Sequence, residues 1–184
     1  MILRSRLGVA ALTAYITAIV TANITTAHYG LIPVGFGLTA TAGTYFAGCA
    51  LFLRNVVQDA LGRRAVVAAI LIGAALSAFT SPSLALASGV AFGVSELADT
   101  AVYTPLRERR NWWARAVIPA SFLGAVIDTF LFLSLAGFPV TERGVAGQLV
   151  GKTWFVWVPT LIVSTYRTRR SVRRDQVSRN TVDA

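Results

Sequence analysis

The apolar residues of this 184-residue sequence are gathered into blocks that are long enough to cross a lipid bilayer. An α-helix rises about 1.5 Å per residue, so roughly twenty apolar residues span the hydrocarbon core. Hydrophobic residues make up 55% of the chain and charged residues only 14%, which leaves too little polar surface for a soluble domain of this length. The pattern predicts an all-α integral membrane protein.

Six such blocks predict a compact bundle of six transmembrane helices over residues 1–166, followed by a basic tail over residues 167–184. The first block follows early arginines but is longer than the core of a typical signal peptide, so we interpret it as a span. The expected spans are Leu7–Ala27, a segment within Leu31–Val57, Ala65–Phe79, Leu84–Tyr103, Trp113–Gly137 and Val145–Thr165.

The basic residues predict an orientation for this bundle. With six spans, all 17 lysines and arginines except Arg143 and Lys152 fall on the side of the two termini, Arg54 being counted at the exit of the second span. Short segments rich in Lys and Arg mark the cytoplasmic face, so we expect both termini in the cytoplasm. The net charge of +9 lies in these clusters, as suits contact with anionic lipid, and we expect no nucleic-acid partner.

Three acids fall inside the expected spans, where charge is costly. Glu96 and Asp99 lie three residues apart on one face of the fourth span, and Asp128 lies just past the middle of the fifth. Each costs about 2.5–3.5 kcal/mol at a helix centre. Antiparallel neighbouring helices can bring the three carboxylates to one cavity, which favours a route for an ion or a substrate. Acids that only fix helix packing are the alternative.

Two further polar side chains are expected inside the bundle, in the same outer half as Asp128. Asn23 lies late in the first span and Lys152 early in the last. Lys152 either pairs with Asp128 or extends to the outer headgroups, and Gln148 shares its helix face one turn earlier. The only histidine, His28, is expected in a loop at the membrane surface.

The sequence contains no motif for covalent chemistry. It has no phosphate-binding glycine loop that ends in Lys-Ser or Lys-Thr, no HExxH and no nucleophile elbow. The lone Cys49 excludes an intrachain disulfide and a cysteine-based zinc site. We therefore expect no enzyme activity, no cofactor and no metal.

Alanines form a stripe at every fourth residue of the first span: Ala10, Ala14, Ala18 and Ala22. Stripes of small residues let helices approach closely. The stripe indicates either ordinary packing within the bundle or a docking face for another membrane subunit.

Two motifs resemble the queuosine precursor transporter family, also called the vitamin-uptake-transporter-like family. They are SELADTAVYTPLR, at residues 95–107, and GAVIDTFLF, at residues 124–132. Family members carry an acidic pair in one helix and an Asp, a small hydroxyl residue and aromatics in the next; Asn23 and Lys152 fit positions in the first and last helices. One departure is that Asn55 and Asp59 stand where the family has two acids at the exit of the second span.

The resemblance implies a bacterial inner-membrane importer of a queuosine precursor for tRNA modification, either 7-cyano-7-deazaguanine or its aminomethyl analogue. The implied substrate or translocation residues are Glu96, Asp99, Asp128, Asn23 and Lys152. An ionised carboxylate can accept both the ring N–H and the exocyclic amine of a guanine-like edge. The alternative is a substrate-binding membrane subunit of an energy-coupling vitamin importer. The expected partners are the deazaguanine base, the bilayer, and either further copies of the chain or a partner membrane subunit.

Overall fold

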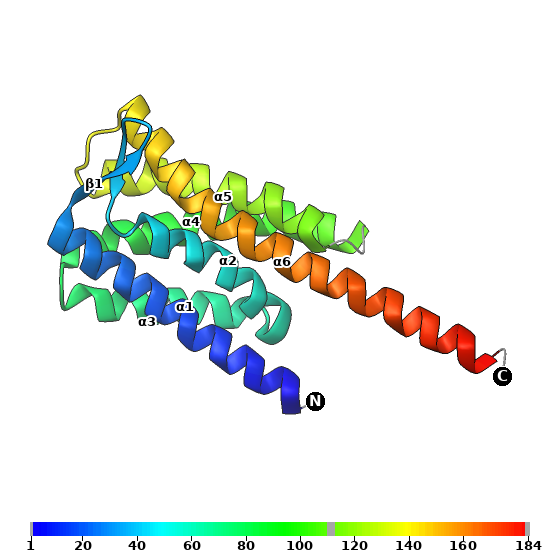
Figure 1. The fold of residues 1–184 in the computed structure, drawn as a ribbon. Coiled ribbons are helices and arrows are strands. Elements are labelled where there is room, and N and C mark those ends of the chain that lie inside the picture. Colours follow the sequence, from blue (N-terminus) through cyan, green and yellow to red (C-terminus); the bar gives the residue numbers. More distant parts are fainter. Residues whose placement is uncertain (1, 110–112, 183–184) are drawn as a thin grey trace.

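The computed structural model describes residues 2–109 and 113–182, and within them the chain forms six helices and one two-stranded hairpin (Figure 1). This confirms the expected helical bundle and adds a small antiparallel sheet to it. The elements in chain order are α1 (Ile2–Tyr29), β1 (Leu31–Gly35), β2 (Leu38–Thr41), α2 (Thr44–Leu61), α3 (Arg63–Ala78), α4 (Pro82–Arg109), α5 (Trp113–Leu135) and α6 (Glu142–Val182).

Three helices are long and apolar enough to cross a membrane: the Leu7–Tyr29 part of α1, the Pro82–Tyr103 part of α4 and the Val117–Leu135 part of α5. They correspond to the first, fourth and fifth expected spans. The helix α3 is shorter, with 16 residues, and α2 carries charged residues in its second half. The helix α6 continues beyond the expected end of the last span at Thr165 into the basic segment, as far as Val182.

The expected second span is wrong in its first half, because residues 31–41 form the hairpin instead of a helix. Strand β1 pairs antiparallel with β2, from Leu31 opposite Thr41 to Gly35 opposite Leu38. Gly35 and Gly37 adopt positive φ angles of 90° and 71° on either side of the tip, a conformation that glycine accepts without steric cost. Pro33 also disfavours a helix interior. The second helix therefore begins only at Thr44.

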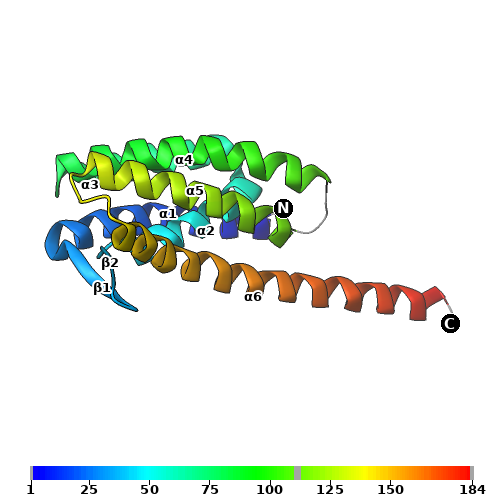
Figure 2. The ribbon, with the colours of Figure 1, turned by 90° about the horizontal axis from the view of Figure 1, so that it is seen from above.

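The helices alternate in direction, which sorts the connections into two ends (Figures 1 and 2). One end of the bundle, called here the termini end, contains the start of α1, the α2–α3 turn, the end of α4, the start of α5 and the end of α6. The hairpin and the α3–α4 and α5–α6 connections lie at the other, called here the hairpin end. His28, expected in a loop, lies exposed in the last turn of α1 at the hairpin end.

Close helix contacts at two glycines bring polar side chains together at the hairpin end. A Cβ atom on Gly43 would lie 2.1 Å from the carbonyl oxygen of Ala22, so α2 begins directly against α1. A Cβ atom on Gly48 would lie 2.6 Å from the carbonyl oxygen of Lys152, so α2 crosses α6 backbone to backbone. Both approaches are closed to any residue with a side chain unless the helices separate.

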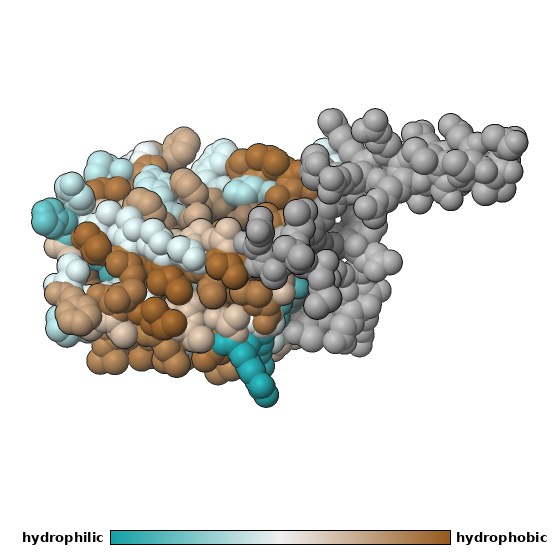
Figure 3. All heavy atoms as spheres, turned by 90° about the horizontal axis from the view of Figure 1, so that it is seen from below, coloured by the Kyte–Doolittle hydropathy of each residue, from teal (hydrophilic) through white to brown (hydrophobic). Residues whose placement is uncertain are grey.

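The face seen in Figure 3 has broad apolar areas beside more polar ones, and many large apolar side chains of the described residues are exposed, as expected of a chain that lies in lipid. Large side chains on several helices stay exposed, among them Leu71, Leu86, Trp154 and Ile162. Contiguous exposed apolar surface of this extent is unfavourable in water and favourable in a bilayer. The buried interior, by contrast, contains most of the polar side chains discussed below.

Candidate functional site

A cavity with about 310 Å³ of atom-free space lies among α1, β2, α2, α4, α5 and α6 at the hairpin end. Its polar lining includes Asn23, Asp128, Gln148 and Lys152, and the rings of Phe92 and Phe132 contribute apolar walls. This space includes a part that is open to the surroundings, so it is a partly open pocket and not an enclosed cavity. Three of the five expected site residues, Asn23, Asp128 and Lys152, therefore meet at one cavity.

Lys152 is buried and paired with Asp128. Its Nζ donates to Oδ2 of Asp128 at 2.7 Å and to Oγ1 of Thr129 at 2.9 Å. The side chains of Lys152 and Asp128 are 1% and 4% exposed. This confirms the expected pairing and shows that Lys152 does not extend to the headgroups. The pair joins α5 to α6 and carries no net charge.

Asn23 links the three helices α1, α3 and α4. Its Nδ2 donates to Oγ of Ser88 at 2.9 Å and of Ser77 at 3.1 Å, and it also lies 3.1 Å from the carbonyl oxygen of Ile19 in its own helix. The amide is 2% exposed. An asparagine held by two hydroxyl groups is fixed in orientation, so its position at the cavity wall is well defined.

Gln148 fastens the hairpin to the bundle. Its Nε2 donates to Oγ1 of Thr41 at 2.8 Å, and its Oε1 accepts from Oγ1 of Thr44 at 2.5 Å. One turn before Lys152 on α6, it is 1% exposed and lines the cavity. The hairpin thereby contributes a polar wall, through Thr41, that the expectation of a continuous second span did not contain.

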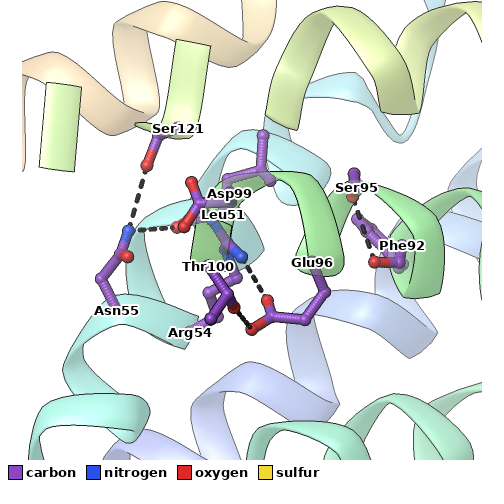
Figure 4. Close-up of polar contacts among 9 residues, drawn as sticks. All are labelled: Leu51, Arg54, Asn55, Phe92, Ser95, Glu96, Asp99, Thr100 and Ser121. Atoms are coloured by element: carbon purple, nitrogen blue, oxygen red, sulfur yellow. Dashed lines mark hydrogen bonds and ion pairs between the residues drawn. The ribbon is translucent and has the colours of Figure 1, made fainter. Parts of the chain in front are cut away.

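Glu96 and Asp99 belong to a second buried cluster (Figure 4). Both carboxylates form ion pairs with the guanidinium of Arg54, which reaches them from α2. Thr100 donates to the other oxygen of Glu96, Oε1, at 3.0 Å. The three charged side chains are at most 3% exposed. Two carboxylates share one guanidinium, so the cluster carries an excess negative charge when both acids are ionised.

The structure corrects two expectations about these residues. The three acids do not meet in one cavity, because only Asp128 lines it while Glu96 and Asp99 contact Arg54. Arg54, expected at the cytoplasmic exit of the second span, lies within α2 and is 2% exposed. The late start of α2 explains the difference, since it moves the second half of this helix into the bundle.

Asn55 and Asp59, which stand where the family has two acids, both form hydrogen bonds to other residues. Asn55 is fully buried, and its Nδ2 donates to Oγ of Ser121 on α5 and to the carbonyl oxygen of Leu51, both at 3.0 Å. Asp59 accepts a hydrogen bond from the hydroxyl of Tyr103 at 2.6 Å. Both side chains join α2 to neighbouring helices, and neither is a free loop residue.

The alanine stripe is half buried within the bundle and half exposed. Ala18 and Ala22 are buried within the bundle, whereas Ala10 and Ala14 are exposed. The half nearer the hairpin end therefore serves packing inside the chain.

The lining of the cavity combines hydrogen-bonding groups with aromatic rings, which are the kinds of contact that small-molecule sites use. Among the side chains that the structure describes, no three His, Cys, Asp or Glu residues are grouped so that they could hold a metal ion. The chemistry on offer at the cavity is therefore that of a carboxylate, an ammonium group, amides, hydroxyls and aromatic rings.

Comparisons with known proteins agree with this picture. The chain matches a family model described as "Putative vitamin uptake transporter" over residues 76–169, just over half of its length. It is also 38% identical over 53 residues to a protein of Haemophilus influenzae with the name "Probable queuosine precursor transporter". That match covers 29% of this chain and 22% of the relative, so the chain aligns with well under two thirds of that protein. No solved structure shows significant similarity to the chain. The family match includes α4, α5 and α6 as far as residue 169, and the chain belongs to the vitamin uptake transporter family.

Proposed function

We propose that the chain imports a deazaguanine precursor of queuosine across the bacterial inner membrane and binds it in the cavity at the hairpin end. The observation that carries this proposal is the meeting of the Asp128 carboxylate, the Gln148 amide and the rings of Phe92 and Phe132 around one space. The partial likeness to the Haemophilus influenzae protein named "Probable queuosine precursor transporter" supports the same substrate class.

The base suits this lining in three ways. A guanine-like edge offers a ring N–H beside an exocyclic amine, and the carboxylate of Asp128 can accept both while Lys152 holds it in place. The second N–H of Gln148 Nε2, which donates once to Thr41, can donate to the carbonyl group of the base. A flat ring is also accommodated by aromatic walls, and its burial between Phe92 and Phe132 adds apolar contact. An analogue without the donor edge would leave the buried carboxylate unsatisfied, which is the basis for selectivity.

The proposed orientation has all six helices across the membrane and both termini in the cytoplasm. Arg63 and Arg64 at the α2–α3 turn, Arg107 and Arg109 in the last turn of α4, and the basic residues of α6 from Arg167 onward belong to the termini end, whereas Arg143 lies at the start of α6 at the hairpin end. Removing the buried Arg54 from the count leaves this asymmetry intact. The cavity at the hairpin end then faces the outer side, where an imported base arrives. Glu96 and Asp99 lie further along the route and do not contact the base in this state.

The test is the queuosine content of tRNA in a bacterial host that cannot make the precursor and lacks its own importer. The host expresses the chain, and limiting deazaguanine base is supplied outside. Import predicts restored queuosine with the intact chain and with Glu142→Gln, which makes the same acid-to-amide change at an exposed position.

A variant that removes the carboxylate without leaving a buried lone charge is needed as well. Asp128→Asn combined with Lys152→Met removes both members of the ion pair, so the bundle keeps its charge balance. We expect this protein to reach the membrane and to give no queuosine. Full restoration by the double variant would refute the assignment of the site, and failure of the intact, membrane-inserted chain would refute the substrate or require a partner subunit.

The second candidate, a substrate-binding subunit of an energy-coupling vitamin importer, is favoured by one observation. Ala10 and Ala14 are exposed on α1 toward the termini end, where a second membrane protein could approach closely. Uptake by the purified chain alone in liposomes would exclude this candidate, whereas binding of the base without uptake would favour it.

A further inference from the structure

The cluster of Arg54, Glu96 and Asp99 contains more negative than positive charge in a place where water is excluded. The side chains of Arg54 and Glu96 are 3% exposed and that of Asp99 is 0% exposed. A buried ion pair is costly even when balanced, and an additional buried carboxylate adds to that cost. The cheapest way to balance the cluster is to add a single positive charge to it.

The two carboxylates differ in how well they are satisfied. Both oxygens of Glu96 have partners, one being Arg54 and the other Thr100. Asp99 pairs with Arg54 through Oδ1, but its Oδ2 has no hydrogen-bond partner among the described residues. A buried, unpartnered carboxylate oxygen is the atom at which protonation costs least. Asp99 is therefore the place where the additional charge belongs.

The neighbourhood of Asp99 favours a proton over a metal cation. The guanidinium of Arg54 already occupies the space between the two carboxylates and repels a second fixed cation. A proton needs no coordination shell. Two buried amide oxygens have no hydrogen-bond partner in the described part of the chain, Oδ1 of Asn55 and Oε1 of Gln58, and both lie on the helix that carries Arg54.

Other charged or titratable groups face this region from the surrounding elements. Tyr15, 1% exposed, lies within electrostatic reach of both clusters. On α3 the titratable side chains are those of Arg63 and Arg64, exposed at its start. The groups to consider around Asp99 are Tyr15 on α1, Arg54 and Asp59 on α2, Glu96 and Tyr103 on α4, Asp128 on α5 and Lys152 on α6.

The cluster lies between the cavity and the termini end. Along α2, Ala47 lines the cavity and Arg54 follows two turns later, about 10 Å further on at 1.5 Å per residue. Along α4, Phe92 lines the cavity and Asp99 again follows two turns later. A molecule that leaves the cavity toward the termini end has to pass between α2 and α4 at the cluster. The two ion pairs from Arg54 to α4 hold these helices together at that point.

We propose that Asp99 is a proton-binding site that couples proton entry to opening of the termini end. A proton that arrives from the hairpin side binds Oδ2 of Asp99, and the neutral acid no longer holds Arg54. Arg54 then pairs with Glu96 alone, and one of its two ionic ties to α4 is lost. The base and the proton leave together toward the termini end, and the deprotonated acid closes the gate again. The inference rests on the transport activity proposed above.

The experiment compares the intact protein, Asp99→Asn and the matched control Asp59→Asn in liposomes. Asparagine has the shape of a protonated aspartic acid and leaves Arg54 balanced by Glu96, so this variant should fold. At one proton per base, the intact protein and the control should accumulate deazaguanine by about tenfold for each pH unit of inside-alkaline gradient. Asp99→Asn should retain exchange of labelled for unlabelled base across the membrane but lose accumulation. Accumulation equal to that of the intact protein would overturn the inference.

A substrate-free measurement separates this inference from the proposed function. Infrared spectra of the intact protein should contain a protonated carboxyl band that changes with pH, is retained in Asp59→Asn and is missing in Asp99→Asn. If the band behaves so but deazaguanine is not transported, the substrate is wrong and the proton site stands. If the base is transported and the band is unchanged in Asp99→Asn, the proton site is wrong and the transport function stands. If Asp99→Asn does not fold, the intact protein is tested alone. Proton coupling predicts that adding the base outside acidifies the interior of the liposomes, and an unchanged interior pH would overturn the inference.

Discussion

Removing the charge of Asp128 should destabilise the bundle strongly, because Lys152 would then be a buried cation without a counter-ion. The Nζ–Oδ2 distance is 2.7 Å, and the two side chains are at most 4% exposed. Breaking a buried ion pair from one side costs about 3–5 kcal/mol, whereas loss of an average hydrogen bond between membrane helices costs about 0.6 kcal/mol. The size of the effect thus separates a charge pair from a simple hydrogen bond.

The assay is reversible unfolding of the purified protein in mixed detergent micelles. We expect Asp128→Asn to lower the free energy of unfolding by about 3–5 kcal/mol. The double variant with Lys152→Met should recover most of this loss, since it leaves neither charge behind. The control Glu142→Gln, at an exposed helix start, should cost less than about 1 kcal/mol.

The comparison of single and double variants yields a coupling energy that needs no absolute reference. A cost near 0.6 kcal/mol for Asp128→Asn, with the double variant no better, would refute the reasoning. Lys152 would then be neutral or solvated in the native state, and the geometry would not describe an ion pair.

Two further predictions concern helix contact and orientation. Gly48→Ala would bring a methyl group to 2.6 Å from a backbone carbonyl oxygen of α6, and we expect it to lower the free energy of unfolding by about 1–3 kcal/mol. A methyl group at Gly93 meets nothing within 4 Å, so Gly93→Ala should be neutral or slightly stabilising in the same unfolding assay. In a Cys49→Ser background, Phe36→Cys at the 95% exposed hairpin tip should react with an impermeant maleimide added to intact cells, and Arg63→Cys only after permeabilisation. The reverse labelling pattern would invert the proposed orientation, and equal effects of the two alanines would exclude a close α2–α6 crossing.

The sequence was sufficient to predict the helices and part of the site. Long apolar blocks give strong signals, so the expected first, fourth and fifth spans coincide closely with α1, α4 and α5. Lys152 and Asp128 were also a predictable pair, because a lone lysine in an apolar helix needs a partner and few are within reach. The cost of burying charge is thus informative even without coordinates.

The hairpin and the role of Arg54 were harder to predict. The glycines and the proline of residues 31–41 indicate an interruption, but hydropathy alone does not distinguish a broken helix from two short strands. A prediction that treats residues 31–41 as helix starts the second helix before Thr44, and Arg54 then falls near the end of that helix. The usable signal was the position of Arg54 itself, which directly follows the apolar run ALFL and precedes Asn55 and two valines.

The two buried clusters differ in a way that bears on why the acids are present at all. Asp128 and Lys152 balance each other, as an ion pair with a packing role would, and they line a cavity. Arg54 with Glu96 would already form a balanced pair between α2 and α4, so packing alone does not require Asp99. An extra carboxylate with an unpartnered oxygen raises the free energy of the closed state. In the coupling proposed above, that cost is recovered when a proton binds there, so replacing Asp99 is the change that tests whether transport is coupled to protons.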